Sequence, residues 1–158
     1  MPRELERLLL HPVVLASLAL WALNDHVLKD ALHDGFSGKL SDVTSLVVAP
    51  VLGAAATAQL GLARARPTRL IVIWSLVMAF VMASINTWEP AATTYRVGLA
   101  AMQWPFRCLA TLSLRPLGQV ALTVDPSDLW TLPAALVPVW LALRAPQVPC
   151  THPSALRG

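Results

Sequence analysis

The chain has 158 residues, of which 56% are hydrophobic and only 13% are charged, and its mean hydropathy is +0.59. Soluble domains carry about 25% charged residues, so a chain this short and this apolar is expected to be an integral membrane protein. The net charge is +3, but the basic residues are scattered between apolar segments and form no stripe, which argues against nucleic-acid binding.

Four apolar segments, with their polar flanks, approach the length of about 17–25 residues that a span requires. They are expected at residues 8–24, 43–63, 70–88 and 129–143. A further apolar segment at 91–114 has Arg107 near its middle, so we expect it to lie on the membrane or dip into it. The predicted fold class is all-α: an integral membrane four-helix bundle with an additional interfacial or re-entrant helix between the third and fourth spans.

Charge predicts the orientation of these spans. The N-terminal segment, the turn at 64–69 and the C-terminal segment together carry seven arginines against Glu4 and Glu6. The positive-inside rule therefore places both termini in the cytoplasm. Residues 1–145 are expected to form a single transmembrane domain, and residues 146–158 a flexible tail.

A polar segment at residues 24–42 follows the first span. We expect the first helix to continue past Leu23 to a C-cap at Gly35, and Ser41 or Asp42 to cap the second helix. Charged groups beside a bilayer are costly, so such a segment usually has a partner or a purpose.

The fourth span opens with a similar polar signal. Asp125 is placed as an N-cap, Pro126 as the first helical residue and Asp128 as an acid in the first turn. The third span ends nearby at Asn86, so three polar helix ends are expected to converge on one outward face. The candidate binding residues on that face are Asn24, Asp25, Lys29, Lys39, Ser41, Asp42, Asp125 and Asp128.

Every one of these residues also has a structural role open to it, as a helix cap or an ion-pair partner. A metal site built from His26, Asp30 and His33 is a weaker alternative, because the pattern is unspecific and two lysines lie in the same segment. We therefore expect neither a metal nor another cofactor.

Several of these strings together resemble an uncharacterised family of small bacterial multi-pass membrane proteins. The matching strings are Asn24-Asp25 with Lys29, then Gly38-Lys39-Leu40-Ser41-Asp42, and finally Asp125-Pro126-x-Asp128-Leu129. The resemblance implies a protein of the bacterial inner (plasma) membrane whose shared feature is this polar cluster, and it implies no activity.

Two functions follow from the sequence. In the first, the outward cluster binds a lipid headgroup or a protein partner, so membrane lipids, a membrane protein or a second copy of the chain are the expected partners. In the alternative, the chain is a membrane-embedded enzyme acting on a lipid-linked or phosphate-bearing substrate at the outer leaflet. The candidate acid/base residues would then be Asp25, Asp42 or Asp128, and a lysine would hold the phosphate. A carrier ranks last, because the second and third spans hold no ionisable residue near the midplane.

Overall fold

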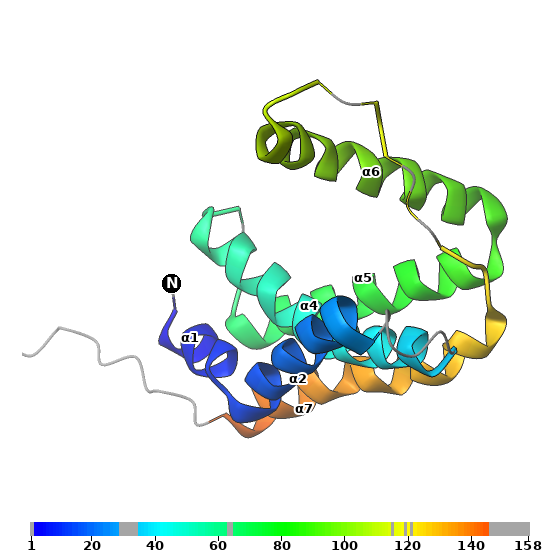
Figure 1. Ribbon diagram of the computed structural model, residues 1–158. Helices are drawn as coiled ribbons and strands as arrows, with labels where there is room; N and C mark the ends of the chain where they lie inside the picture. The colour runs from blue at the N-terminus through cyan, green and yellow to red at the C-terminus, as the bar shows by residue number, and fades with distance from the viewer. Residues whose placement is uncertain are drawn as a thin grey trace, which may run out of the picture.

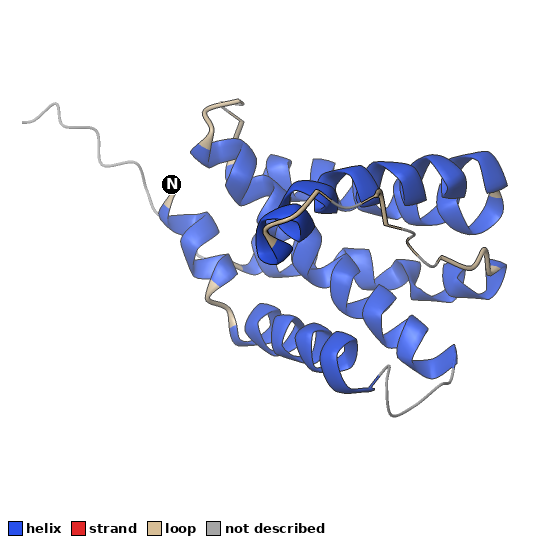
Figure 2. Ribbon diagram, turned by 45° about the horizontal axis from the view of Figure 1, so that its top comes forward, coloured by secondary structure: helices blue, strands red, loops and turns tan. Residues whose placement is uncertain are grey.

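The computed structural model describes residues 2–28, 35–62, 65–114, 116–118, 120 and 122–145. Within this part of the chain the protein is all-helical, and neither view shows a strand (Figures 1 and 2). The α-helices are α1 (Arg3–Leu9), α2 (Pro12–Leu23), α4 (Gly35–Gln59), α5 (Pro67–Thr87), α6 (Glu89–Thr111) and α7 (Leu136–Arg144). A π-helical turn, η1 (Asn24–Leu28), follows α2, and a 3-10 helix, η2 (Pro126–Ala135), precedes α7.

Two helices are long and apolar enough to cross a membrane. They are Gly38–Gln59 within α4, and Pro67–Thr87, which is α5. A third candidate consists of α1 and α2, which are bent by 48° with respect to each other. The bend falls where Pro12 cannot donate a backbone hydrogen bond and the His11 side chain accepts one from the Val13 N–H.

The last helical element was expected to be one α-helix at 129–143, and the structure shows two kinds of helix instead. η2 contains Pro133, whose ring disfavours a regular α-helical turn, and the chain becomes α-helical only at Leu136. The 3-10 part rises faster along its axis than an α-helix does, so this element is longer than its residue count suggests.

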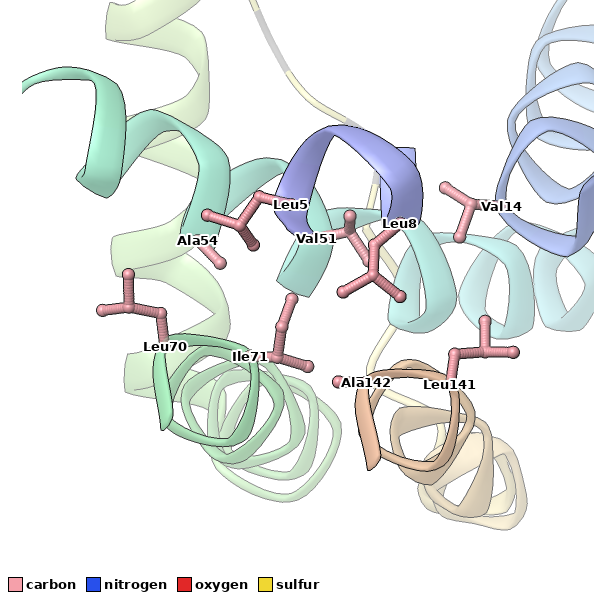
Figure 3. Close-up of a cluster of buried hydrophobic side chains, with 9 residues drawn as sticks. All are labelled: Leu5, Leu8, Val14, Val51, Ala54, Leu70, Ile71, Leu141 and Ala142. Carbon is pink, nitrogen blue, oxygen red and sulfur yellow. The ribbon is translucent and has the colours of Figure 1, made fainter. Parts of the chain in front are cut away.

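The main hydrophobic core lies at the arginine-rich end of the helices. Figure 3 shows side chains gathered there. They come from α1, α2, α4, α5 and α7. The members of this core are Leu5, Leu8, Val14, Val51, Ala54, Leu70, Ile71, Leu141 and Ala142. A second, smaller core of Leu46, Met82, Ile85 and Ala135 lies among α4, α5 and η2. Because the two cores use opposite ends of α4 and α5, successive helices run in alternating directions, and the polar segments lie at the end away from the main core.

Many large apolar side chains point away from both cores. On α5, Ile73, Leu76 and Phe80 are 52%, 66% and 74% exposed. On α2, Leu15 and Leu23 are 45% and 49% exposed. Soluble monomers rarely expose apolar surface on this scale, and lipid tails would cover it.

Two sequence predictions about the polar segment are wrong. Gly35 begins α4 instead of ending the first helix, and Ser41 and Asp42 lie inside α4 instead of capping it. Hydroxyl groups in these turns bond back to the helix: Thr44 Oγ1 donates to the Leu40 carbonyl at 2.8 Å. Polar residues are therefore accommodated within the helix. The expected continuation of the first helix through 29–34 lies outside the described residues.

The expected interfacial segment at 91–114 corresponds to α6. In Figure 1, α6 stands apart from the other helices and joins α5 through a tight turn. Its inward residues, Ala92 and Ala100, are small, whereas Phe106 and Leu109 are 72% and 71% exposed. The chain then returns beside α6, where both Arg96 Nε and Arg96 Nη2 donate to the Leu122 carbonyl, at 3.1 and 2.6 Å.

Candidate functional site

A lysine from α4 joins the polar residues at the start of η2. Lys39 Nζ donates to Ser127 Oγ at 2.6 Å and to Asp128 Oδ1 at 2.8 Å, and it lies 3.8 Å from Asp125 Oδ2. The Lys39 side chain is 41% exposed and that of Asp128 only 17%. The Lys39 ammonium therefore connects α4 to η2, which are far apart in the sequence.

Asp125 is the N-cap of η2, and Pro126 takes the first position, as the sequence predicted. The Asp125 carboxylate accepts a hydrogen bond from the Ser127 N–H at 2.9 Å. The hydrogen bonds from Ser127, first that of its backbone N–H, hold the pKa of the Asp125 carboxyl below its usual value. Lys39 lowers the same pKa further through its charge.

Asn86 connects this corner to the end of α5. Its side chain is buried, with Oδ1 accepting from the Asp125 N–H at 3.4 Å and Nδ2 donating to the Met82 carbonyl at 3.2 Å. The ends of α4, α5 and η2 are therefore held together by polar contacts.

A second group of polar contacts joins η1 to α4. Asn24 is fully buried, and its Nδ2 donates to Ser41 Oγ at 2.8 Å. The Ser41 hydroxyl in turn donates to Asp25 Oδ1 at 2.9 Å. The widened π-helical turn carries both Asn24 and Asp25, and π-helical turns of this kind are frequent at functional sites.

The hydrogen bonds described above connect helix ends in two groups, and they include six of the eight predicted binding residues. We call these six, with Ser127 and Asn86, the polar cluster: Asn24, Asp25, Lys39, Ser41, Asn86, Asp125, Ser127 and Asp128. Lys29, Asp30, His33 and the side chain of His26 lie outside the described residues. Across the described part of the chain, no three His, Cys, Asp or Glu side chains are placed to hold a metal ion.

Asp42, the remaining predicted binding residue, lines a cavity. This cavity, which we call the Asp42 cavity, has a volume of about 460 Å³ and lies among α2, α4, α5, α6 and the returning chain. Asp42 and Ser45 provide polar groups, and the remaining wall is largely apolar, with Trp21, Leu46, Met78, Met82, Tyr95 and Leu122 among its residues. A neighbouring pocket of about 390 Å³ between α5 and α6 shares Val81, Ile85 and Tyr95 with it.

Sequence reasoning missed two parts of this site. Ser127 lies between the two predicted acids and has the right chemistry to bind an ammonium, but only the fold brings Lys39 to it. Tyr95 reaches the Asp42 cavity from α6. The sequence of α6 does not indicate which other helix Tyr95 faces.

Chemically, the arrangement places hydrogen-bonded helix ends beside a mostly apolar cavity. Asp25 and Asp128 accept hydrogen bonds from Ser41 and Lys39. Asp42 lines a cavity whose volume falls in the range that small ligands occupy, about 300–1,000 Å³. Comparison of the chain with protein-family models, with curated proteins and with solved structures gives no match. The site is therefore interpreted from its own chemistry.

Proposed function

We propose that this chain is a multi-pass protein of the bacterial inner membrane that binds a lipid in the Asp42 cavity. In this proposal the polar cluster fixes the helix ends that shape the cavity, and it performs no chemistry. The observation that carries the proposal is the composition of the cavity wall, in which Asp42 and Ser45 accompany an otherwise largely apolar lining. An amphiphile has the same division, with a polar headgroup and an apolar chain.

The proposed topology has four spans: the bent pair of α1 and α2, then α4, α5, and η2 with α7. The length of the fourth element, η2 with α7, supports a count of four spans. At about 2.0 Å per residue for 3-10 and about 1.5 Å for α-helix, its 10 and 9 residues reach about 33 Å. A hydrocarbon core is about 30 Å thick, so this element is long enough to cross it.

The proposed orientation has both termini in the cytoplasm and the polar cluster at the outer surface. Arg7, Arg69 and Arg144 are close in sequence to members of the main core, so they gather at one end of the molecule. Cytoplasmic ends of spans are enriched in such residues. In this arrangement α6 would lie on or dip into the outer leaflet, where its exposed Phe106 and Leu109 contact lipid.

Lipid extraction with a cavity-filling variant tests the proposal. The protein would be purified in a mild detergent, and its bound lipids measured by mass spectrometry. Ala49→Trp places a large side chain in the Asp42 cavity, and Leu76→Trp places the same side chain on α5 at a position 66% exposed. We expect Ala49→Trp to lose the retained lipid and Leu76→Trp to keep it. Equal retention in two variants with equal unfolding midpoints would contradict the proposal.

The enzyme alternative makes a different prediction. It assigns acid/base chemistry to Asp25, Asp42 or Asp128. In the structure Asp25 accepts a hydrogen bond from Ser41, and Asp128 accepts one from Lys39. That pairing favours a scaffold role for both. Turnover of a lipid-linked phosphate substrate that disappears in a folded Asp42→Asn variant would support the enzyme in place of the binding protein.

A further inference from the structure

Another pocket lies at the opposite end of the molecule from the polar cluster. It has a volume of about 370 Å³ and is formed where the bend between α1 and α2 meets the end of α7. Its lining includes Arg7, Leu8, His11, Val13, Trp140 and Arg144. Leu8 also belongs to the main core, so the apolar floor of the pocket is a fixed part of the fold. We call this the basic pocket.

The charges of the basic pocket have one sign. Arg7 and Arg144 come from opposite ends of the chain, and within the described residues neither forms an ion pair. No carboxylate lines the pocket in that part of the chain, although Glu4 and Glu6 belong to the same helix as Arg7. Two guanidinium groups without a counter-charge favour an anion, and guanidinium matches the geometry of phosphate oxygens.

Two features hold these donors in place. The Arg144 guanidinium lies over the Trp140 ring, with Cζ 4.2 Å from the ring centroid. His11 Nδ1 accepts from the Val13 N–H at 3.2 Å, so a neutral imidazole carries its proton on Nε2, where it can donate to a ligand. The N-terminus of α2 also begins here, and its dipole favours negative charge.

We infer that the basic pocket binds the phosphodiester headgroup of an anionic phospholipid. Leu8, Val13 and Trp140 supply apolar surface beside the charged groups. An acyl chain would pack against this surface, whereas a free anion would not contact it. The pocket also lies at the end of apolar helices, where headgroups are found. This inference is independent of the Asp42 cavity, which lies at the other end of α4 and α5.

Binding to nanodiscs of defined composition tests the inference. Native mass spectrometry would compare phosphatidylglycerol with phosphatidylcholine on the full chain and on Arg7→Gln/Arg144→Gln. The matched control, Arg3→Gln/Arg69→Gln, removes the same charge from exposed positions at the same end that do not line the pocket. We expect the pocket variant to bind phosphatidylglycerol at least about tenfold more weakly, and the control to change much less.

Two further measurements keep the test decisive. Val13→Glu adds a carboxylate to the pocket at a position 40% exposed, so it should weaken phosphatidylglycerol binding without unfolding the protein, even if the double variant folds poorly. Inorganic phosphate should not displace the lipid at comparable concentration. Equal losses in pocket and control variants, or full displacement by phosphate, would overturn the assignment of a lipid site.

Discussion

Lys39 Nζ and Asp128 Oδ1 lie 2.8 Å apart, although their residues are separated by 89 positions in the sequence. The contact joins the beginning of α4 to the beginning of η2. Because both elements start at the same end of the molecule, the ion pair fixes their relative depth as well as their separation. The Asp42 cavity lies beside the same part of α4, so its shape depends on this contact.

A double-mutant cycle on Lys39 and Asp128 should show a modest favourable coupling energy. Lys39→Met leaves the Asp128 carboxylate, which is only 17% exposed, without its ammonium partner. The Lys39 side chain is 41% exposed, so solvent weakens the coupling. We still expect Lys39→Met/Asp128→Asn to be more stable than Lys39→Met alone, because the double variant no longer holds an unpaired carboxylate. Unfolding midpoints in one detergent measure this. Strictly additive losses would show that the pair contributes no coupling.

Two glycines of α4 should respond to alanine with opposite signs. A Cβ at Gly53 would lie 2.5 Å from Trp74 Cδ2, whereas a Cβ at Gly38 would meet nothing within 4 Å. We expect Gly53→Ala to lower the free energy of unfolding by about 1–3 kcal/mol through overpacking. Gly38→Ala should raise it by about 0.5–1 kcal/mol, because alanine favours the helix. Chemical unfolding measures both, and a loss at Gly38 would indicate that α4 does not extend through that residue.

Only some of the local signals in the sequence predicted local structure correctly. The Asp125-Pro126 start of η2 is confirmed, because an N-cap needs only a side chain and the backbone amides that follow it. The placement of Ser41 and Asp42 as caps is wrong, because α4 begins at Gly35, before both residues. The contact of Lys39 with Ser127 in η2 could not be predicted from the local sequence. The 3-10 form of η2 was also missed, since a periodic pattern does not distinguish one helix type from another when proline interrupts it.

The low pKa of Asp125 predicts a dependence of stability on acid pH. Its ionised form is favoured in the folded protein, so the stabilisation is present above the usual value of 3.8 and is lost as the pH falls below it. Asp125→Ser keeps an acceptor for the Ser127 N–H but does not titrate. The unfolding midpoint of the wild type should exceed that of Asp125→Ser at neutral pH, and the difference should shrink toward pH 3. A difference that does not depend on pH would show that the carboxylate charge is unimportant.

Labelling of single cysteines should reveal the proposed orientation. In a Cys108→Ser/Cys150→Ser background, Thr93→Cys lies near the start of α6 and Leu62→Cys lies in the turn after α4. An impermeant maleimide should label Thr93→Cys in cells with an intact inner membrane, and Leu62→Cys only after that membrane is permeabilised. The reverse pattern would invert the topology and place the basic pocket outside.

The charge of Asp42 should govern which lipids the Asp42 cavity retains. Asp42→Asn keeps the shape of the side chain and removes its charge, so the apolar wall of Met78, Met82 and Tyr95 is unchanged. We expect the variant to retain lipid in similar amount but with a different headgroup composition, shifted away from amine-bearing headgroups and toward anionic ones. Mass spectrometry of lipids extracted from variant and wild type measures this, with Ala49→Trp as the control that loses lipid of every class. An unchanged headgroup composition would show that Asp42 faces the cavity without contacting its occupant, and would leave the apolar wall as the only determinant of binding.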